Sequence, residues 1–137
     1  MKRSAKAVWK GTVKDGSGVL TTQSTTLNDT QYSFKSRFED GVGTNPEELL
    51  AAAHAGCFTM KTSALLSEAG YNPETLETDC KISLVDGKIT LSELTLTAKI
   101  PAISEDDFQK IAKDAKGNCP VSQAFSFEKT LTATLVS

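Results

Sequence analysis

The sequence has few cysteines and no cluster of basic residues, and both shortages narrow the kinds of protein that it can encode. Three cysteines in 137 residues, an odd number and far apart, do not form the disulfide framework of a small secreted domain. Fifteen basic residues are scattered among seventeen acidic ones, and the net charge of -2 disfavours a nucleic-acid partner. Residues 1–6 lack the apolar region of a secretory signal, and no run of about 18 apolar residues follows. We therefore expect a cytoplasmic protein without a membrane partner.

Internal repeats, low-complexity tracts and linker-like stretches are absent as well. Hydrophobic residues make up 39% of the chain and charged residues 23%, which are ordinary fractions for a globular protein. The sequence therefore predicts a single domain over residues 1–137.

The alternation of apolar and polar residues predicts the secondary structure. Residues 5–38 have the pattern of a strand meander with a turn at 16–18, and residues 46–68 have that of a long helix. That helix is apolar almost all round, which is typical of a helix buried in the middle of its fold.

The second half of the chain begins with a predicted hairpin. Residues 80–100 form two strand patterns around the turn residues Asp86 and Gly87, with a bulge expected before Leu96. A second helix opens at Ser104 and closes at Gly117, and a last strand covers residues 131–135. Because strands and helices are segregated and do not alternate as βαβ units, we expect an α+β domain with antiparallel sheets.

The start of the long helix carries clear capping signals. Asn45 fits the N-cap and Pro46 the first helical position, and Glu48 stands where the glutamate of a capping box reaches back. Because Glu48 already has this structural role, Glu47 is the better candidate for a functional site.

Cys57 lies near the middle of the long helix and allows two interpretations. It is either a small buried apolar residue or a thiolate nucleophile, whose pKa must be lowered by a nearby positive charge or hydrogen-bond donor. The helix dipole contributes little at mid-helix. Arg37 is the candidate cation because a guanidinium stays charged and can be held by a carboxylate, although it could also simply lie on the polar face of a strand.

The other two cysteines differ in their surroundings. Cys119 precedes Pro120 and would stand at a helix N-terminus, a position that favours a thiolate and is usually accessible, with a buried structural cysteine as the alternative. Cys80 alternates with apolar residues on a strand, so packing explains it and we assign it no role.

His54, the only histidine, precedes Cys57 by three residues, so the two side chains share one face of the helix. A Cys-His dyad is therefore possible. With Cys119 the two residues could supply three metal ligands, but no CxxC or HxxxH spacing supports a metal site.

Two segments of the sequence form a recognisable pattern. The first reads TNPEELLAAAHAGCF over residues 44–58, and the second reads CPVS over residues 119–122. Together they closely resemble the OsmC/Ohr family of hydroperoxide-reducing proteins. His54 and the context of Arg37 are more similar to the osmotically inducible (OsmC) branch than to the organic hydroperoxide resistance (Ohr) branch. The resemblance covers the whole chain and implies the OsmC-like fold, in which antiparallel sheets enclose long buried central helices in an intertwined homodimer.

The resemblance also implies a function and a set of site residues. Cys57 would be the peroxidatic thiol and Cys119 the resolving thiol, with Arg37 and Glu47 organising the site. The expected activity is an antioxidant peroxidase that prefers organic hydroperoxides to hydrogen peroxide. It would need no bound cofactor and no metal, and an external dithiol of the lipoyl type would reduce it.

The spacing of Glu47 and Cys57 gives an independent reason to expect a dimer. Ten residues on a continuous helix correspond to about 15 Å along its axis, which is too far for one site. Either the helix breaks between them or a second chain completes the site, and the unbroken helical composition favours an obligate dimer.

Two rival functions remain at this stage. A Cys-His hydrolase would use Cys57 with His54 and would not need Cys119, but no oxyanion-hole motif is evident. A non-catalytic carrier of apolar ligands, or an oxidant sensor, would bind lipids stably without turning over peroxide.

Overall fold

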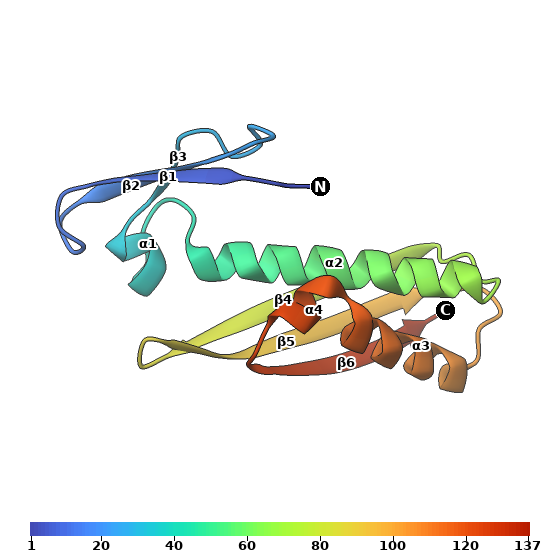
Figure 1. The fold of residues 1–137 in the computed structure, drawn as a ribbon. Coiled ribbons are helices and arrows are strands. Elements are labelled where there is room, and N and C mark those ends of the chain that lie inside the picture. Colours follow the sequence, from blue (N-terminus) through green and yellow to red (C-terminus); the bar gives the residue numbers. More distant parts are fainter. The chain divides into compact units, whose positions relative to one another are not determined.

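The computed structural model describes residues 1–137 and divides into two compact units, residues 1–49 and residues 50–137 (Figure 1). Each unit is described by itself below. The single domain that the sequence predicts stays a prediction.

The first unit contains a three-stranded antiparallel sheet in the order β1-β2-β3, which confirms the predicted meander. Its strands are β1 (Ala5–Lys10), β2 (Ser17–Thr22) and β3 (Thr30–Tyr32). Gly18 lies inside β2 and not in the turn, between the aromatic rings of β1 and β3. A Cβ atom at Gly18 would come within 2.5 Å of the Trp9 ring, so this position needs glycine for close packing.

The strand predicted through residue 38 is wrong at its end, because residues Phe34–Phe38 form the short helix α1. The cause is a local capping box that the alternation of aromatic residues had hidden. The Ser33 hydroxyl accepts a hydrogen bond from the backbone N–H of Ser36 at 3.2 Å. The Ser36 hydroxyl accepts one from the backbone N–H of Ser33 at 2.8 Å. Arg37 therefore lies on a helix.

Helix α2 (Pro46–Glu68) begins where the sequence predicts. The Asn45 side chain accepts a hydrogen bond from the backbone N–H of Glu48 at 2.8 Å, which confirms Asn45 as the cap. The predicted capping box is wrong in its second half, because the Glu48 carboxylate accepts its hydrogen bond from the Thr44 hydroxyl at 2.7 Å.

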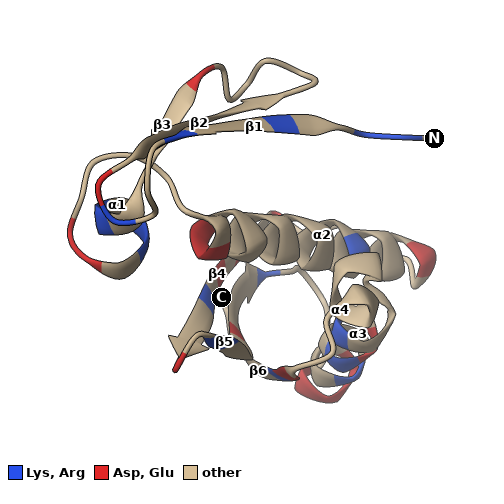
Figure 2. Cartoon of the chain, turned by 60° about the vertical axis from the view of Figure 1, so that its left-hand side comes forward, with Lys and Arg blue, Asp and Glu red and all other residues tan.

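Within one chain, helix α2 is buried along one stripe and not all round, so the burial expected from its composition stays a prediction for the dimer. The buried side chains recur every fourth residue, as expected for one face of a helix: His54, Phe58, Thr62 and Leu66. Small or apolar residues on other faces are exposed: Ala52, Ala53, Gly56, Met60 and Ala64. A Cβ atom at Gly56 would meet nothing within 4 Å. Figure 2 shows the helix tan between its acidic ends, apart from one basic residue.

By length and composition alone, α2 is apolar enough to cross a membrane. The core helix of a soluble protein meets the same two criteria. The buried stripe of α2 belongs to the hydrophobic core of the second unit, which gives its apolar composition a packing explanation.

The second unit contains a three-stranded sheet in the order β4-β5-β6. Strands β4 (Thr75–Val85) and β5 (Lys88–Lys99) form the predicted hairpin around Asp86 and Gly87, both of which have positive φ angles, as a tight hairpin turn requires. The register shifts between Ser83 and Leu84, which pair with Leu91 and Ile89, so Thr90 of β5 has no partner. The bulge predicted before Leu96 is therefore present in β5, at Thr90.

Strand β6 (Glu128–Val136) corrects the predicted topology, because it pairs with β5 in the parallel direction. Parallel neighbours need a long crossover, usually with a helix, and here α3 (Glu105–Asn118) and α4 (Pro120–Ala124) supply it. The sheet is therefore mixed, and β5-α3-α4-β6 is a βαβ unit that the apparent segregation of strands and helices had hidden.

One face of this sheet carries the core of the second unit. Ser92, Leu94, Leu96 and Ala98 alternate along β5 and are buried, while the residues between them are exposed. The buried apolar cluster also contains residues of α2 and α3, among them Phe58, Leu66, Phe108 and Ala112. Figure 1 shows α2 and α3 lying along the sheet.

Candidate active site

The two predicted redox cysteines lie in contact. Cys57 is near the middle of α2 and Cys119 lies between α3 and α4, and their sulfur atoms are 2.7 Å apart as free thiols. A disulfide has its sulfurs about 2.05 Å apart, so a shift of less than about 1 Å would join them. The contact links positions that are 62 residues apart in the sequence.

Cys119 is placed by the junction of two helices. Its backbone N–H donates to the carbonyl of Ala115 and ends α3, while Cys119 itself is the N-cap of α4, whose first residue is Pro120. This confirms the predicted helix N-terminus. The expected accessibility is wrong, because Cys119 is completely buried and Cys57 is the partly exposed thiol. An oxidant from solvent therefore reaches Cys57 first.

Burial raises the pKa of Cys57 above its ordinary value, and the hydrogen bond with Cys119 raises it further. Two groups of the second unit act in the opposite direction and lower this pKa. They are the backbone N–H of Val121 and the positive charge of Lys61. Because the raising effects dominate, the second unit alone does not activate this thiol.

The other two predicted residues form an ion pair in the first unit. The Arg37 Nε donates to Glu47 Oε1 at 3.0 Å, and the Glu47 side chain is only 10% exposed. Glu48 instead accepts a hydrogen bond from Thr44, so Glu47 is the acidic partner of Arg37. The second carboxylate oxygen of Glu47 is buried without a hydrogen-bond partner. A buried acceptor of this kind can take a hydrogen bond from a further group.

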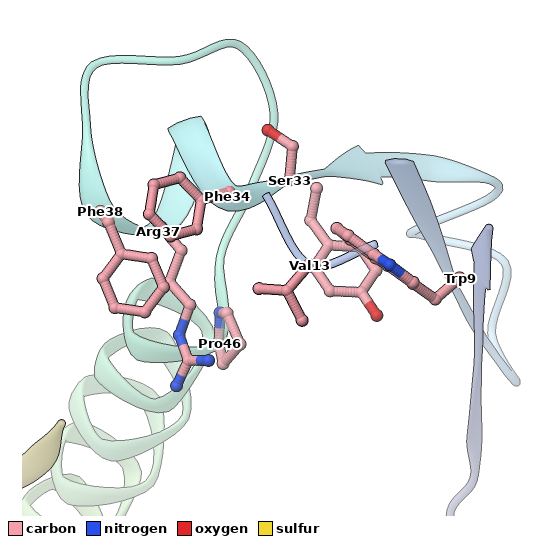
Figure 3. Close-up of a pocket in the computed structure, with 8 residues that line it drawn as sticks. Trp9, Val13, Ser33, Phe34, Arg37, Phe38 and Pro46 are labelled. Carbon is pink, nitrogen blue, oxygen red and sulfur yellow. The ribbon is translucent and has the colours of Figure 1, made fainter. Parts of the chain in front are cut away.

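A cavity of about 190 Å³ lies beside this ion pair, and every residue that lines it belongs to the first unit. Figure 3 shows the rings of Phe34 and Phe38 on one side and Trp9 on the other, with Arg37 and Pro46 between them. The Arg37 guanidinium lies 5.0 Å from the centre of the Phe38 ring, within the range of a cation–π contact. The arrangement combines apolar walls with one positive charge.

The four predicted site residues therefore form two pairs, one in each unit. Helix α2 is continuous from Pro46 to Glu68, so Glu47 and Cys57 are separated by about 15 Å along its axis. The helix break considered above as an explanation for this spacing is not present.

Sequence reasoning missed the surroundings of His54. Its Nδ1 is hydrogen-bonded to the Ser92 hydroxyl and its Nε2 to the Ser122 hydroxyl, both at 2.6 Å. All three side chains are buried. Both ring nitrogens are thus engaged, and the possible Cys57-His54 dyad is not formed. Ser122 stands in the same short motif as Cys119 and could have been suspected, whereas nothing in the sequence singles out Ser92.

The third thiol, Cys80, lies 3.2 Å from the Ser92 hydroxyl, and burial raises its pKa. The structure contains no group of three or more His, Cys, Asp or Glu side chains that could hold a metal ion.

Comparisons with known proteins agree on one family. Residues 38–134 match the family model described as OsmC-like protein. The chain is 41% identical to the peroxiredoxin OsmC of Escherichia coli over 98% of this chain and 97% of that protein. It is 32% identical to the organic hydroperoxide resistance protein-like 1 of Staphylococcus epidermidis, over 62% of this chain and 64% of the relative.

Solved structures show the same fold at low sequence identity. An OsmC-like protein of unknown function from Vibrio cholerae superposes with a TM-score of 0.76 at 16% identity, covering 97% of this chain and 99% of that one. The organic hydroperoxide resistance protein OhrB of Bacillus subtilis gives a TM-score of 0.63 at 22% identity, covering 97% and 98% of the two chains. With the family model covering most of its length, this α+β chain belongs to the OsmC-like protein family.

Proposed function

We propose that this protein is a thiol peroxidase that reduces organic hydroperoxides to alcohols through Cys57 and Cys119. The observation that carries the proposal is the 2.7 Å contact between the two sulfur atoms, one partly exposed and the other buried. Family membership and 41% identity to a peroxiredoxin support a cysteine-based peroxidase. The name of the staphylococcal relative, an organic hydroperoxide resistance protein, supports the substrate class.

In the first step the Cys57 thiolate attacks the distal oxygen of the hydroperoxide. An S–O bond forms, the O–O bond breaks, and the alkoxide takes a proton and leaves as an alcohol. Cys57 is thereby oxidised to a sulfenic acid and the peroxide is reduced. Cys57 carries out this step because it is the thiol of the pair that solvent reaches.

In the second step the Cys119 sulfur attacks the Cys57 sulfenic acid. The disulfide forms and water leaves, which removes the sulfenic acid before more peroxide can oxidise it further. An external dithiol then reduces the disulfide by exchange, and we propose a dithiol of the lipoyl type. No bound cofactor enters this cycle. The cytoplasmic location expected from the sequence stays a prediction.

Arg37 and Glu47 are proposed to supply the charge that the thiol lacks. A guanidinium beside Cys57 would lower the pKa of this thiol and stabilise the negative charge that develops on the leaving oxygen. Glu47 would hold the guanidinium in one orientation through the 3.0 Å hydrogen bond. The apolar walls of the neighbouring cavity suit the alkyl group of an organic hydroperoxide better than hydrogen peroxide.

We propose that the active form is a homodimer in which Arg37 and Glu47 of one chain complete the site at Cys57 of the other. The separation of about 15 Å along the continuous helix α2 supports this arrangement. The exposed small and apolar residues of α2 give a second argument, because a contiguous apolar helix face is typical of an interface. Light scattering that found a fully active monomer would exclude it.

The test of the activity is peroxide consumption with tert-butyl hydroperoxide and dihydrolipoamide as substrates. We expect turnover by the native chain, none by Cys57→Ser, and near-native turnover by the matched control Cys80→Ser, which removes the thiol outside the pair. If the native chain does not consume peroxide but binds fatty acids stably, the apolar-ligand carrier becomes the better function. If Cys80→Ser were as inactive as Cys57→Ser, the assignment of the pair would be wrong.

A further inference from the structure

A network of buried hydrogen bonds crosses the second unit, and the peroxidase cycle does not use it. The network runs from the Cys80 thiol to the Ser92 hydroxyl, then to the two nitrogens of His54, and ends at the Ser122 hydroxyl. Ser92 and His54 are completely buried, and Ser122 is 2% exposed. Burying polar groups costs folding free energy unless they are hydrogen-bonded, so the presence of this network needs an explanation.

The number of available hydrogens fixes which group donates and which accepts at each step of the network. If Nδ1 of His54 carries the proton, it donates to Ser92, whose hydroxyl donates to the Cys80 sulfur. Nε2 of His54 then accepts the hydrogen of the Ser122 hydroxyl, so every hydroxyl hydrogen has an acceptor. In the other tautomer Nε2 donates to Ser122, whose own hydrogen has no partner. The Nδ1–H tautomer of His54 therefore satisfies more hydrogen-bond donors of the network than the other tautomer does.

The last residue of this network, Ser122, lies on α4, the helix that begins next to the resolving cysteine. Cys119 is the N-cap of α4, and its sulfur lies 2.7 Å from the Cys57 sulfur. Ser122 is the buried residue of this helix.

Helix α4 is held by contacts to the rest of the second unit, among them the packing of Val121 against the hydrophobic core and the hydrogen bond from the Gln123 side chain to the carbonyl of Gly117. It is five residues long and its N-cap makes no side-chain hydrogen bond. A helix this short is not stable by itself and depends on tertiary contacts. His54 supplies two such contacts, the hydrogen bond to Ser122 and an edge-on ring contact to Phe125, the residue that ends α4, with ring centres 5.0 Å apart.

We propose that His54 is a positioning residue for the resolving cysteine, which it acts on through Ser122 and α4. His54 and Cys57 are three residues apart on α2, so the imidazole holds α4 against the same helix that carries the peroxidatic thiol. Loss of this link frees α4, and Cys119 spends less time within bonding distance of Cys57. The role of His54 in the peroxide cycle rests on the proposed function, but its effect on the thiol pair does not.

The test compares Ser122→Ala with Thr62→Val. The first variant removes the hydroxyl that holds α4. The second removes another completely buried hydroxyl on α2, which bonds only to the carbonyl of Phe58 in the same helix. Each variant loses one buried hydrogen bond, so thermal unfolding is measured first to check that the two variants lose a similar amount of stability.

Two readouts follow, one with peroxide and one without it. With tert-butyl hydroperoxide, dimedone trapping and mass spectrometry measure how fast Cys57 is oxidised and how fast its sulfenic acid becomes the disulfide. Without peroxide, equilibration in mixtures of reduced and oxidised dithiothreitol measures the stability of the Cys57-Cys119 disulfide.

In Ser122→Ala we expect disulfide formation to slow about tenfold and the equilibrium constant for the disulfide to fall by about the same factor, as for one lost buried hydrogen bond. Thr62→Val should leave both within about twofold of the native values. Native behaviour of Ser122→Ala, or an equal loss in Thr62→Val, would overturn the inference. If native Cys57 formed no sulfenic acid, the proposed function would fail, while the dithiothreitol equilibrium would still decide the role of His54.

Discussion

The two units of this chain are built in different ways. All the residues of the buried hydrophobic core lie in residues 50–137, whereas the buried positions of residues 1–49 are Gly18, Ser36, Thr44 and Glu47. Large apolar side chains of the first unit remain exposed, among them Val13, Phe38 and Val42. The unit that holds the thiols is therefore organised by apolar packing, and the unit that holds the charges by local hydrogen bonds and an ion pair.

This difference shows how the chemistry is divided. A buried, packed thiol pair has fixed geometry, but burial raises the pKa of Cys57 and works against its activation. The positive charge that could lower this pKa again is that of Arg37, and it belongs to the first unit, which has no apolar core of its own. Such a unit needs another surface to cover its apolar residues, so assembly of the protein and activation of the thiol are expected to be coupled.

The largest expected effect separates the two units by stability. Phe108 is completely buried in the core, and Phe38 is 48% exposed. Phe108→Ala should lower the free energy of unfolding by roughly 3–5 kcal/mol through a cavity, and Phe38→Ala by about 1 kcal/mol or less. Urea denaturation measures both. Equal losses would show that the first unit packs as tightly as the second and would break the comparison.

The next effect tests whether the charge of Arg37 acts on peroxide turnover without changing the geometry of the Cys57-Cys119 pair. Arg37→Met should lower peroxide turnover by about 100-fold, because the developing negative charge loses its stabilising partner. It should slow oxidation by diamide as the thiolate population falls, but leave the final yield of the Cys57-Cys119 disulfide under excess diamide unchanged, since both thiols lie in the other unit. Lys35→Met on the same helix is the matched control and should keep native turnover. A lower final yield of the disulfide in Arg37→Met would mean that Arg37 acts on the fold instead of the charge.

The smallest effect concerns the pH dependence of stability. Burial, and to a lesser extent the charge of Lys129, lower the pKa of His54 below its ordinary value of 6.5. Between pH 6.5 and the lowered value the unfolded chain therefore binds a proton that the folded chain does not. The free energy of unfolding should then fall from pH 7 to pH 5.5, by at most about 1.3 kcal/mol, which is the limit set by the unfolded value of 6.5.

This slope can be attributed to one residue, because His54 is the only histidine in the chain. Urea denaturation of the native chain and of His54→Gln at both pH values measures it. An equal slope in both proteins would show that the buried imidazole is not its source.

Local signals in the sequence predicted much of the site. Asn45 at the helix start, the Asp86-Gly87 turn and Pro120 after Cys119 each act on the neighbouring backbone, and the structure has all three features. The direction of β6 could not be predicted in this way, because parallel pairing depends on how a whole crossover packs.

The partners of His54 were also out of reach of local reasoning. Ser92 and Ser122 lie 38 and 68 residues away along the chain, and no periodic pattern connects such positions. The catalytic roles of Cys57, Cys119, Arg37 and Glu47 stay predictions, although the structure brings them together in pairs.

The long sequence separation of the two thiols has a consequence for the protein during its synthesis. Cys57 leaves the ribosome 62 residues before Cys119. At about 5–20 residues per second, this interval lasts several seconds. During that time a nascent chain that meets peroxide carries an oxidisable thiol with no second thiol beside it to form the protective disulfide. Because a nascent chain also lacks the charge that is proposed to activate Cys57, it is protected by the low reactivity of an ordinary thiol, and the disulfide takes over that protection only in the finished protein.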